Sequence, residues 1–468
     1  MYDIAVIGGG PGGYVAAIRA AQLGAKVLLV EKEKLGGVCL NRGCIPTKTL
    51  LNSAERWHEL QQCGSFGLQA GQIGFDFTAV MRRKDQVVEQ LQSGIVQLVA
   101  GNGITVCQGT ASLQGKEQLA VRTAAGTEIY QVRRIILATG SDSVTPPLPG
   151  IELPGVIGSD QVLSLSNLPR SMAIIGAGAV GVEFATIFQA FGSEITLIEM
   201  QPSILPNIDS DLVKRMALLL RKRGIELLTA TKVTSIRQGA DGLILTAATG
   251  DKVQEIAAEK VLNAVGRRPN LSGLGLETAG VAYDRQGIPV DAKMETNIPG
   301  IYAVGDLTGR YMWAHAASAE GIVAAENALG GNTTMNYTAV PGCIFTDPEI
   351  ATVGLSEEEA VAAGRRVRTG RFNFAGIGKA VAMGKPDGLA KIVADEDSGA
   401  VLGLHILGSH ASDLIMEGVA AVNQGLTIQD LKHMIHPHPT LAEVIGEAAH
   451  NTEGLAIHQL RLGGGQRS

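Results

Sequence analysis

The stretch D-I-A-V-I-G-G-G-P-G-G, residues 3–13, decides the fold of this 468-residue chain. Its apolar run has the length of a buried strand and ends in glycines spaced Gly-x-Gly-x-x-Gly. A helix-like segment follows, and then a second apolar run, K-V-L-L-V-E, at residues 26–31. This order of strand, glycine-rich turn, helix and strand predicts a Rossmann unit, in which the glycines let the backbone approach a pyrophosphate at the helix N-terminus.

The same plan occurs a second time along the chain. Residues 171–181 read S-M-A-I-I-G-A-G-A-V-G, and residues 194–199 read E-I-T-L-I-E. The equivalent positions of the two copies are Gly8 and Gly176, Gly10 and Gly178, Gly13 and Gly181, and Glu31 and Glu199. One such glycine motif is a weak signal, and two glycine-rich turns without a ligand are the alternative. Because each copy follows a strand, opens a helix and precedes a glutamate, we expect two bound dinucleotides.

The glutamate that ends each copy indicates which dinucleotide binds. A carboxylate accepts hydrogen bonds from ribose hydroxyls and repels a 2′-phosphate. Residues 200–207, which follow Glu199, contain no Arg or Lys that could pair with such a phosphate. The second site is therefore predicted to bind NAD rather than NADP.

A cysteine pair follows the first Rossmann unit, in the stretch G-G-V-C-L-N-R-G-C-I-P-T-K at residues 36–48. Cys39 and Cys44 have four residues between them, and a helix is expected to begin after them. A helix N-terminus favours the thiolate form, so the pair is interpreted as a redox pair beside a bound cofactor. Half of a metal site is the alternative, but no second Cys/His pair of suitable spacing lies nearby.

Composition limits the class of protein. The chain has 45% hydrophobic residues, 60 glycines and a formal net charge of -6, which is typical of a globular α/β protein and gives no support for a nucleic-acid partner. It exceeds the roughly 250–300 residues at which single cores stop growing, so we expect several domains. We expect no signal peptide, because residues 2–7 already have the pattern of a strand, and Glu183 argues against a membrane span at residues 172–191. A cytoplasmic location is expected. The sparse cysteines Cys63, Cys107 and Cys343 are expected as small core residues.

The whole chain resembles the flavoprotein pyridine-nucleotide disulfide oxidoreductases. The motifs that carry this resemblance are residues 8–13, 37–48, 138–141, 176–183, 264–269, 296 with 302–306, and 436–443. The fold predicted is α/β, with two Rossmann-like dinucleotide-binding domains and a C-terminal α+β dimerisation domain. The expected boundaries are residues 1–147 for the first part of the FAD-binding domain, 148–270 for the NAD-binding domain, 271–340 for a central domain completing the FAD site, and 341–468 for the interface domain. Apolar strands at 389–393 and 401–406 and a helix at 411–424 support the last domain.

The resemblance implies one non-covalent FAD per subunit in the first unit and NAD+ or NADH in the second. It implies that Glu31 meets the adenosine ribose, that Asp306 meets the flavin side of the FAD, and that Lys48 lies near flavin N5. The remaining positions implied to bind the two cofactors are Gly8, Gly10, Gly13, Gly109, Ala111, Thr139, Gly140, Ser141, Ala314 and His315 for FAD, and Gly176, Gly178, Gly181, Glu199 and Gly266 for the nicotinamide nucleotide. For His315, a satisfied core histidine is the alternative.

The resemblance also implies catalytic roles. Cys44 would lie against the flavin as the charge-transfer thiolate, Cys39 would exchange with substrate, and the two would form a disulfide in the oxidised enzyme. Glu183 would be the ion-pair partner of Lys48. His438, oriented by Glu443, would be the acid/base and would come from the other subunit of a homodimer. Histidine changes its protonation near neutral pH, and a carboxylate fixes its tautomer, so this pair suits the exchange of thiol protons.

Within the family, the sequence is most similar to members that oxidise protein-bound dihydrolipoamide to lipoamide with NAD+. Their partner is the lipoyl domain of a 2-oxoacid dehydrogenase or glycine-cleavage component. Mercuric reductases and large thioredoxin reductases carry a C-terminal cysteine or selenol pair, which the tail at residues 461–468 lacks. Glutathione and trypanothione reductases use NADPH, and a transhydrogenase normally lacks the intact cysteine pair. Three alternatives stay open: another disulfide reductase of the family, a chiefly structural subunit of a dehydrogenase complex, and metal ligation by His436 and His438.

Overall fold

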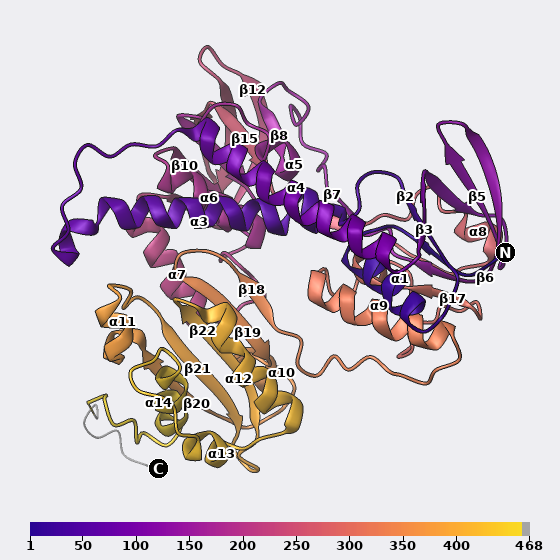
Figure 1. The fold of residues 1–468 in the computed structure, drawn as a ribbon. Coiled ribbons are helices and arrows are strands. Elements are labelled where there is room, and N and C mark those ends of the chain that lie inside the picture. Colours follow the sequence, from indigo (N-terminus) through magenta and orange to yellow (C-terminus); the bar gives the residue numbers. More distant parts are fainter. Residues whose placement is uncertain (461–468) are drawn as a thin grey trace. The chain divides into compact units, whose positions relative to one another are not determined.

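The computed structural model describes residues 1–460, so the tail at 461–468 lies outside the described residues. The chain divides into two compact units (Figure 1). The first unit comprises residues 1–169, 236–243 and 259–336, and the second comprises residues 170–235, 244–258 and the chain from Tyr337 onward. Each unit is described by itself below. The domain boundaries expected from the sequence stay a prediction.

The first unit is built on a sheet with the strand order β3-β2-β1-β6-β5-β4, in which β17 also pairs with β6. The strands of this unit are β1 (Tyr2–Ile7), β2 (Val27–Glu31), β3 (Thr105–Gln108), β4 (Thr110–Leu113), β5 (Gln118–Thr123), β6 (Gly126–Leu137), β7 (Ser141–Ser143), β8 (Val156–Gly158), β15 (Lys260–Asn263), β16 (Arg267–Pro269) and β17 (Ile301–Ala303). Its helices are α1 (Pro11–Gln22), α2 (Gly37–Arg42), α3 (Cys44–Gln61), α4 (Phe77–Gly101), α5 (Ser159–Val162), α8 (Leu276–Ala279) and α9 (Ala314–Ala328), with the 3-10 turns η1 (Cys63–Phe66) and η2 (Gly305–Thr308).

The central strands of this sheet are covered on both faces. Ile4 and Val6 of β1 belong to one buried cluster, whereas Ala5 and Ile7 belong to another. Strand β1 pairs in parallel with β2 and with β6. Strands buried on both faces have apolar residues at every position, and this explains the continuous apolar run that opens the chain.

The second unit contains the other Rossmann copy and a C-terminal sheet. Its strands are β9 (Ser171–Ile175), β10 (Glu194–Ile198), β11 (Glu226–Leu228), most of β12 (Thr231–Gln238) and of β13 (Leu243–Thr249), β14 (Lys252–Ala258), β18 (Gly342–Ile344), β19 (Glu349–Gly354), β20 (Val367–Asn373), β21 (Leu389–Asp395) and β22 (Val401–Gly408). Its helices are α6 (Ala179–Ala190), α7 (Ser210–Lys222), α10 (Glu357–Ala362), α11 (Gly378–Ala382), α12 (Ala411–Gln424), α13 (Ile428–His433) and α14 (Glu443–Asn451), with the 3-10 turn η3 (Phe374–Gly376). Strand β10 pairs in parallel with β9 and β11, as a Rossmann unit requires.

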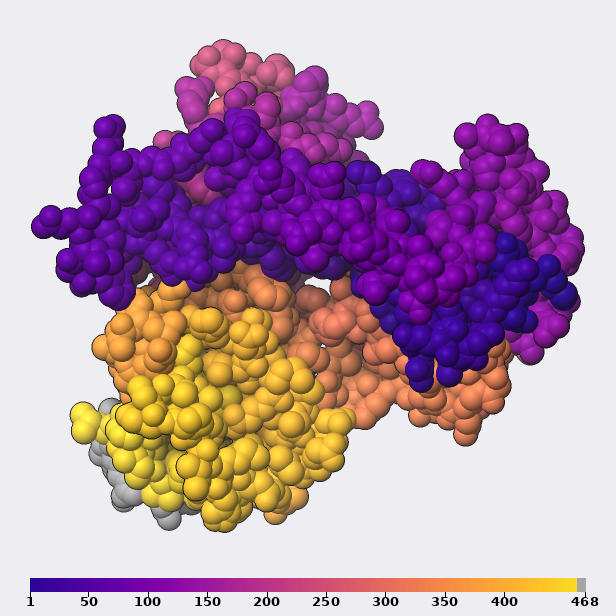
Figure 2. All heavy atoms as spheres, viewed as in Figure 1, coloured from indigo at the N-terminus to yellow at the C-terminus, as the bar shows by residue number. Residues whose placement is uncertain are grey.

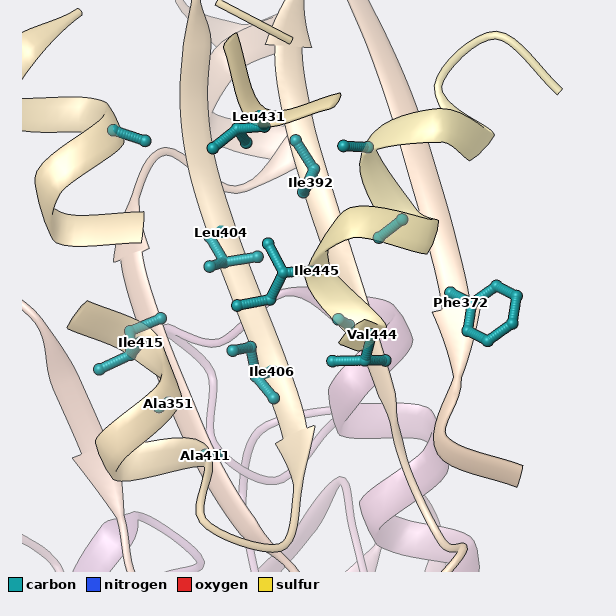
Figure 3. Close-up of a cluster of buried hydrophobic side chains, with 14 of the residues drawn as sticks. Ala351, Phe372, Ile392, Leu404, Ile406, Ala411, Ile415, Leu431, Val444 and Ile445 are labelled. Atoms are coloured by element: carbon teal, nitrogen blue, oxygen red, sulfur yellow. The ribbon is translucent and has the colours of Figure 1, made fainter. Parts of the chain in front are cut away.

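The C-terminal sheet is antiparallel, with the order β18-β19-β22-β21-β20. Helix α12 packs on β19 and β22, and α14 packs on β20 and β21. Ile415, Leu404 and Ile445 meet in the apolar core between these elements (Figure 3). Figure 2 shows the outer face of the C-terminal residues, coloured orange to yellow. The predicted α/β fold with a C-terminal α+β domain is confirmed, and so are the strands and the helix predicted in that domain.

A buried ion network fixes the start of α7 to the C-terminal sheet within the second unit. Lys391 of β21 is fully buried, and its Nζ lies 2.8 Å from Asp209 Oδ2 and 2.7 Å from both Asp211 Oδ2 and Glu357 Oε2. Burial lowers the pKa of Lys391, but the hydrogen bonds to the three carboxylates outweigh it and raise the pKa above its ordinary value. The ammonium therefore stays charged and joins segments that are far apart in the sequence.

Candidate active site

The glycine turn after β1 leaves no room for a side chain. Gly8 has a φ of +105°, which favours glycine, and a Cβ atom on Gly13 would lie 1.8 Å from the Gly8 carbonyl oxygen. Helix α1 begins at Pro11, directly after the N-cap Gly10. A proline at the first helical position loses no hydrogen bond, because that amide has no partner within the helix. The turn therefore presents bare backbone at a helix N-terminus, the arrangement that suits a pyrophosphate.

Glu31 closes this turn from the end of β2. Its Oε2 accepts a hydrogen bond from the Gly9 amide at 2.6 Å, and its Oε1 accepts one from the Glu33 amide at 2.8 Å. Only 9% of the residue is exposed. A buried carboxylate held beside a glycine turn fits the ribose of a dinucleotide, so the residues of the first unit suit the FAD that the resemblance implies.

The second copy has the same geometry. Gly176 has a φ of +101°, and a Cβ atom on Gly181 would lie 1.9 Å from the Gly176 carbonyl oxygen. Glu199 accepts hydrogen bonds from the amides of Ala177 and Gln201, both at 2.8 Å. Gly178 is the N-cap of α6. The predicted structural repeat is therefore present, and its residues suit a second dinucleotide.

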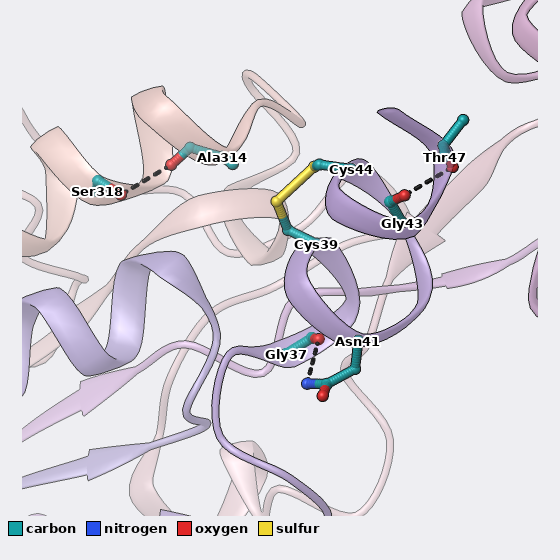
Figure 4. Close-up of a disulfide and its surroundings, with 8 residues drawn as sticks. All are labelled: Gly37, Cys39, Asn41, Gly43, Cys44, Thr47, Ala314 and Ser318. Carbon is teal, nitrogen blue, oxygen red and sulfur yellow. Dashed lines mark hydrogen bonds between the residues drawn. A yellow bond between two sulfur atoms is a disulfide. The ribbon is translucent and has the colours of Figure 1, made fainter. Parts of the chain in front are cut away.

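Cys39 and Cys44 form a disulfide (Figure 4). Cys44 is the first residue of α3, at the helix start expected from the sequence, whereas Cys39 lies in α2, a helix that the sequence analysis did not predict. Gly43 separates the two helices, and a Cβ atom there would lie 3.0 Å from the Val38 carbonyl oxygen. Thr47 Oγ1 donates a hydrogen bond to the Gly43 carbonyl at 2.6 Å, which helps to fix the first turn of α3. Cys44 is thus held at the N-terminus of α3, where the thiolate form of a cysteine is favoured.

The first turn of α9 belongs to the surroundings of the disulfide, where Figure 4 shows Ala314 and Ser318. His315 follows Ala314, and its ring stacks on Trp313 with 6.1 Å between the ring centroids and 25° between the planes. His315 is exposed, so it is not a core histidine. Its predicted place beside a cofactor stays a prediction.

Asp306 lies in a polar cluster that the sequence identified only in part. Asp306 Oδ2 accepts a hydrogen bond from Ser141 Oγ at 2.5 Å. Arg267 Nε donates to Ser141 Oγ at 2.7 Å, and Arg267 Nη2 donates to the Ser141 carbonyl at 2.5 Å. The sequence analysis gave no role to Arg267, although it lies in the motif at residues 264–269. The antiparallel pairing of β16 with β7 brings this arginine to Ser141.

Glu320 is a second residue that the sequence analysis missed. It is fully buried in α9, and its Oε2 accepts a hydrogen bond from the Gly305 amide at 2.6 Å. Gly305 precedes Asp306, so this bond fixes the backbone that carries the aspartate. A glutamate among alanines at residues 314–325 was the only local signal.

The remaining positions predicted to bind FAD or NAD lie on turns and strand ends. Thr139 Oγ1 donates to the Asn270 carbonyl at 3.0 Å, and Gly140 and Gly266 have φ values of +68° and +131°. The Gly109 amide donates to the Glu31 carbonyl at 2.9 Å. Ala111 is buried in β4. The contacts of these positions with a cofactor stay a prediction.

His438 is paired with Glu443, as predicted. His438 Nδ1 lies 2.8 Å from Glu443 Oε1, and Glu443 Oε2 accepts a hydrogen bond from the Thr440 amide at 2.8 Å. Burial raises the pKa of Glu443, but the bonds from His438 and Thr440 outweigh it and hold the pKa below its ordinary value. The carboxylate therefore stays charged next to an imidazole whose side chain is 77% exposed.

His436 has a carboxylate of its own. Its Nε2 lies 3.1 Å from Glu417 Oε1 of α12, and this hydrogen bond raises the pKa of His436 against the opposing effect of burial. The sequence analysis missed this pair because Glu417 lies 19 residues upstream. Residues 1–460 contain no group of His, Cys, Asp and Glu side chains placed to hold a metal ion.

Lys48 and Glu183 belong to different units. Lys48 lies on α3 one turn after Cys44. Glu183 of α6 is 5% exposed, and its Oε1 accepts a hydrogen bond from the Phe345 amide at 2.9 Å. The ion pair predicted between Lys48 and Glu183 stays a prediction.

The cysteines outside the disulfide are partly buried rather than fully buried. Cys107 and Cys343 pack against apolar clusters, in agreement with small residues at the border of a core. Cys63 begins η1, at the end of α3. Across residues 1–460, none of the helices combines the length and the apolar character that a membrane span needs.

Comparisons with known proteins agree with this arrangement. The sequence model of the family described as pyridine nucleotide-disulphide oxidoreductase matches residues 2–321. The chain belongs to this family. The model of the family's dimerisation domain matches residues 340–449 and supports a homodimer.

Several curated relatives cover nearly the whole chain. A protein of Thermus scotoductus named dihydrolipoyl dehydrogenase is 44% identical over 98% of this chain and 99% of its own length. One of Bacillus subtilis with the same name is 41% identical over the same shares. Among solved structures, the HOCl-induced flavoprotein disulfide reductase RclA from Escherichia coli superposes with a TM-score of 0.86, at 29% identity over 96% of this chain and 99% of that chain. Family and neighbours together imply a flavin and a pyridine nucleotide for this chain.

Proposed function

We propose that this protein is an NAD+-dependent dihydrolipoyl dehydrogenase with one FAD per subunit. The observation that carries the proposal is the Cys39–Cys44 disulfide at the start of α3, next in sequence to the glycine turn closed by Glu31. The names of the curated relatives indicate dihydrolipoamide as the dithiol substrate. The reaction takes two electrons and two protons from the dithiol and delivers a hydride to NAD+, with release of one proton.

The chain's own residues carry the disulfide exchange. A substrate thiolate attacks Cys39 Sγ, which breaks the bond to Cys44 and leaves Cys44 as a thiolate at the N-terminus of α3. The second substrate thiolate then attacks the mixed disulfide, releases Cys39 and closes the lipoyl disulfide. FAD, when held in the first unit, would supply the two-electron acceptor for the cysteine pair and the hydride donor for NAD+.

His438 is the base in this proposal. Its Nδ1 is held by Glu443 at 2.8 Å, which leaves Nε2 to accept the proton of a substrate thiol. Glu443 stabilises the imidazolium that then forms. We assign this base to the cysteine pair of the second copy of the chain in the homodimer, because the family's dimerisation domain carries it.

The cofactors are assigned to the two glycine turns. In the first unit, Gly8, Gly10, Gly13 and Glu31 would hold the pyrophosphate and ribose of FAD, with Asp306 at its flavin side. In the second unit, Gly176, Gly178, Gly181 and Glu199 would hold NAD+. Lys48 would lie at the flavin and pair with Glu183. The other positions assigned to cofactor contact are Gly109, Ala111, Thr139, Gly140, Ser141, Gly266, Ala314 and His315.

The partner proposed besides a second copy is the lipoyl domain of a 2-oxoacid dehydrogenase or glycine-cleavage component. One comparison of substrates tests the function: NAD+ reduction by free dihydrolipoamide against NADPH oxidation by glutathione disulfide. We expect the first reaction alone, because Glu199 repels a 2′-phosphate. Turnover with glutathione disulfide and NADPH would favour another disulfide reductase of the family. Absence of a flavin spectrum would favour a structural subunit.

The base is tested by His438→Gln, with His436→Gln as the matched control. Loss of a positioned base slows its step by roughly 10²–10⁴-fold, so we expect that loss in the reduction of the disulfide by dihydrolipoamide. Flavin reduction by NADH does not need the thiol proton and should change far less. Stopped-flow absorbance measures the two half-reactions separately. If His438→Gln slows both equally, or if His436→Gln matches it, His438 is not the base.

A further inference from the structure

The proposed reaction opens the disulfide in every cycle. Once that bond is broken, only non-covalent contacts keep Cys39 within reach of Cys44. Cys39 lies on α2, a helix of six residues that ends at Gly43. A single short helix is only marginally stable by itself, so the position of Cys39 in the reduced enzyme depends on contacts between α2 and its neighbours.

Two side chains of α2, on adjacent residues, make such contacts. Asn41 Nδ2 donates a hydrogen bond to the Gly37 carbonyl at 2.9 Å (Figure 4). It donates another to the Leu35 carbonyl at 3.1 Å, just before α2. Asn41 therefore holds the turn of α2 together and attaches it to Leu35, which lies two residues before α2. Arg42 reaches further, because its partner Asp160 belongs to another helix.

Arg42 spans two segments of the first unit. Its Nη2 lies 2.6 Å from Glu33 Oε2, and its Nε lies 3.5 Å from Asp160 Oδ2. Glu33 follows β2, and Asp160 belongs to α5, more than a hundred residues further along the chain. The Nε atom is buried and makes no hydrogen bond among the described residues, so its ion pair with Asp160 is its main compensation.

Both partners are themselves held in place. The Glu33 amide donates to Glu31 Oε1 at 2.8 Å, which connects it to the carboxylate that closes the glycine turn. Helix α5 is held at its end by Lys84, whose Nζ donates to the Leu163 carbonyl at 2.8 Å. The guanidinium thus joins the end of α2 to two fixed points.

We propose that Arg42 is a positioning residue that holds Cys39 next to Cys44 in the reduced enzyme. This inference rests on the proposed function, because positioning matters only if the disulfide opens in the reaction. The contacts of Arg42 themselves do not depend on which substrate is used. A fixed pair of thiols has a high effective concentration and closes readily to the disulfide. Loss of the ion pairs lets α2 move, lowers that concentration and shifts the equilibrium towards the dithiol.

A purely electrostatic role of Arg42 predicts a shift of the dithiol/disulfide equilibrium in the opposite direction. The positive charge of Arg42 favours a nearby thiolate, and its removal would disfavour the reduced form. In Arg42→Met, positioning therefore predicts a less negative reduction potential of the cysteine pair, and electrostatics predicts a more negative one. The double variant Glu33→Gln/Asp160→Asn keeps the positive charge of Arg42 and removes both anchors.

The experiment is an anaerobic redox titration of the holoenzyme against reduced and oxidised dithiothreitol. Alkylation traps the free thiols, and mass spectrometry counts them on the peptide that carries both cysteines. Half-exposed ion pairs have modest effects, so we expect Arg42→Met to shift the dithiol/disulfide equilibrium towards the dithiol by about threefold to tenfold. This is about 14–30 mV, since a tenfold change corresponds to 29.6 mV for two electrons.

The double variant should shift the equilibrium in the same direction, and adding Arg42→Met to it should change little more. Arg56→Met is the matched control, because Arg56 makes an exposed ion pair with Glu59 on α3 and should leave the equilibrium unchanged. A more negative potential in Arg42→Met, or no shift at all, overturns the proposal. A wild-type pair that does not titrate as a two-electron couple would instead overturn the proposed function.

Discussion

The two Rossmann copies are equal in their turns and different in what covers their helices. In both, a first glycine with φ near +100° stands against a glycine whose Cβ would lie less than 2 Å from its carbonyl oxygen. In both, the closing glutamate accepts two backbone hydrogen bonds, Glu31 at 2.6 and 2.8 Å and Glu199 at 2.8 Å twice. The parts that would meet a dinucleotide are therefore the same, and the difference in use that we propose must come from the surroundings.

The first turn of the helix that opens the first site packs closely against other segments. A Cβ on Gly12 would lie 3.0 Å from Val304 Cγ2, and a Cβ on Gly321 of α9 would lie 2.4 Å from the Gly12 carbonyl oxygen. The equivalent of Gly12 in the second copy is Val180, which is 39% exposed. The two helices therefore differ at this position of the first turn, although α6 has more buried residues than α1 further along. In our proposal the same local design holds FAD in the first unit and NAD+ in the second.

The largest effects are expected from the glycines that meet backbone. Gly13→Ala and Gly181→Ala each place a methyl group within 2 Å of a carbonyl oxygen, so the turn must deform at a cost of about 3 kcal/mol. We expect Gly13→Ala to lose its flavin, whereas Gly181→Ala keeps the flavin and loses NAD+ binding. Flavin content from absorbance, thermal unfolding and nucleotide titration measure these outcomes.

Gly178→Ala is the matched control for this pair. Gly178 has a φ of -74°, and nothing lies within 4 Å of the position where its Cβ would stand. The variant should unfold at the temperature of the wild type. If Gly181→Ala is as stable as Gly178→Ala, or if it loses its flavin, the two copies are not used as proposed.

The features that the sequence predicted correctly depend on residues that lie close together along the chain. The glycine turns, the closing glutamates and the placing of Cys44 at a helix start each depend on residues close together in the chain, and all are present. The contact of His438 with Glu443 was also predicted, although α14 begins at Glu443 itself rather than at the Pro-Thr step before it.

The features that were missed come from tertiary packing. Arg267 reaches Ser141 across 126 residues of sequence, and Glu320 reaches Gly305 from within a helix whose burial no local pattern shows. Arg42 lies between the two cysteines in the sequence, but its ionic partner Asp160 lies 118 residues further along the chain. Contacts of this kind depend on how the strands and helices are arranged in space, and local patterns in one sequence do not reveal that arrangement.

An intermediate effect is expected where Glu199 is exchanged for a residue that tolerates a phosphate. Glu199→Val with Gln201→Arg removes a charge that repels the 2′-phosphate of NADP+ and adds one that attracts it. Hydrogen bonds to charged groups contribute about 1.5–3 kcal/mol, so preference should move towards NADP+ by roughly 10–150-fold in kcat/KM. Steady-state kinetics with both nucleotides measure this shift.

The equivalent change in the first copy sharpens the comparison. Glu31→Gln keeps a side chain that can bond the Gly9 and Glu33 amides through one oxygen only, so it should weaken the retention of FAD and leave the choice of nucleotide unchanged. Glu199→Gln is its matched partner and should raise the KM for NAD+ while the flavin stays bound. A wild-type enzyme that uses NAD+ and NADP+ equally would show that Glu199 does not make the choice.

The smallest effect is expected at a position where α6 carries a charged residue and α1 an apolar one. Glu183 of α6 stands where α1 has Val15, and it is 5% exposed with its Oε1 accepting from the Phe345 amide at 2.9 Å. Glu183→Val makes the second helix like the first, but leaves that amide without its acceptor, at a cost of about 1–3 kcal/mol in the free energy of unfolding. Glu183→Gln keeps an acceptor oxygen and should cost less than half as much. In denaturant unfolding the two variants therefore separate the contribution of the hydrogen bond from that of the charge.

The charge of Glu183 is tested by stopped-flow reduction of NAD+ by the dithiol-reduced enzyme, because the proposed pair with Lys48 depends on that charge. Glu183→Gln should slow this step while reduction of the disulfide by dihydrolipoamide is unchanged. Equal stability of the Val and Gln variants would show that the bond to Phe345 contributes little, and an unchanged rate in Glu183→Gln would remove the charge from the reaction.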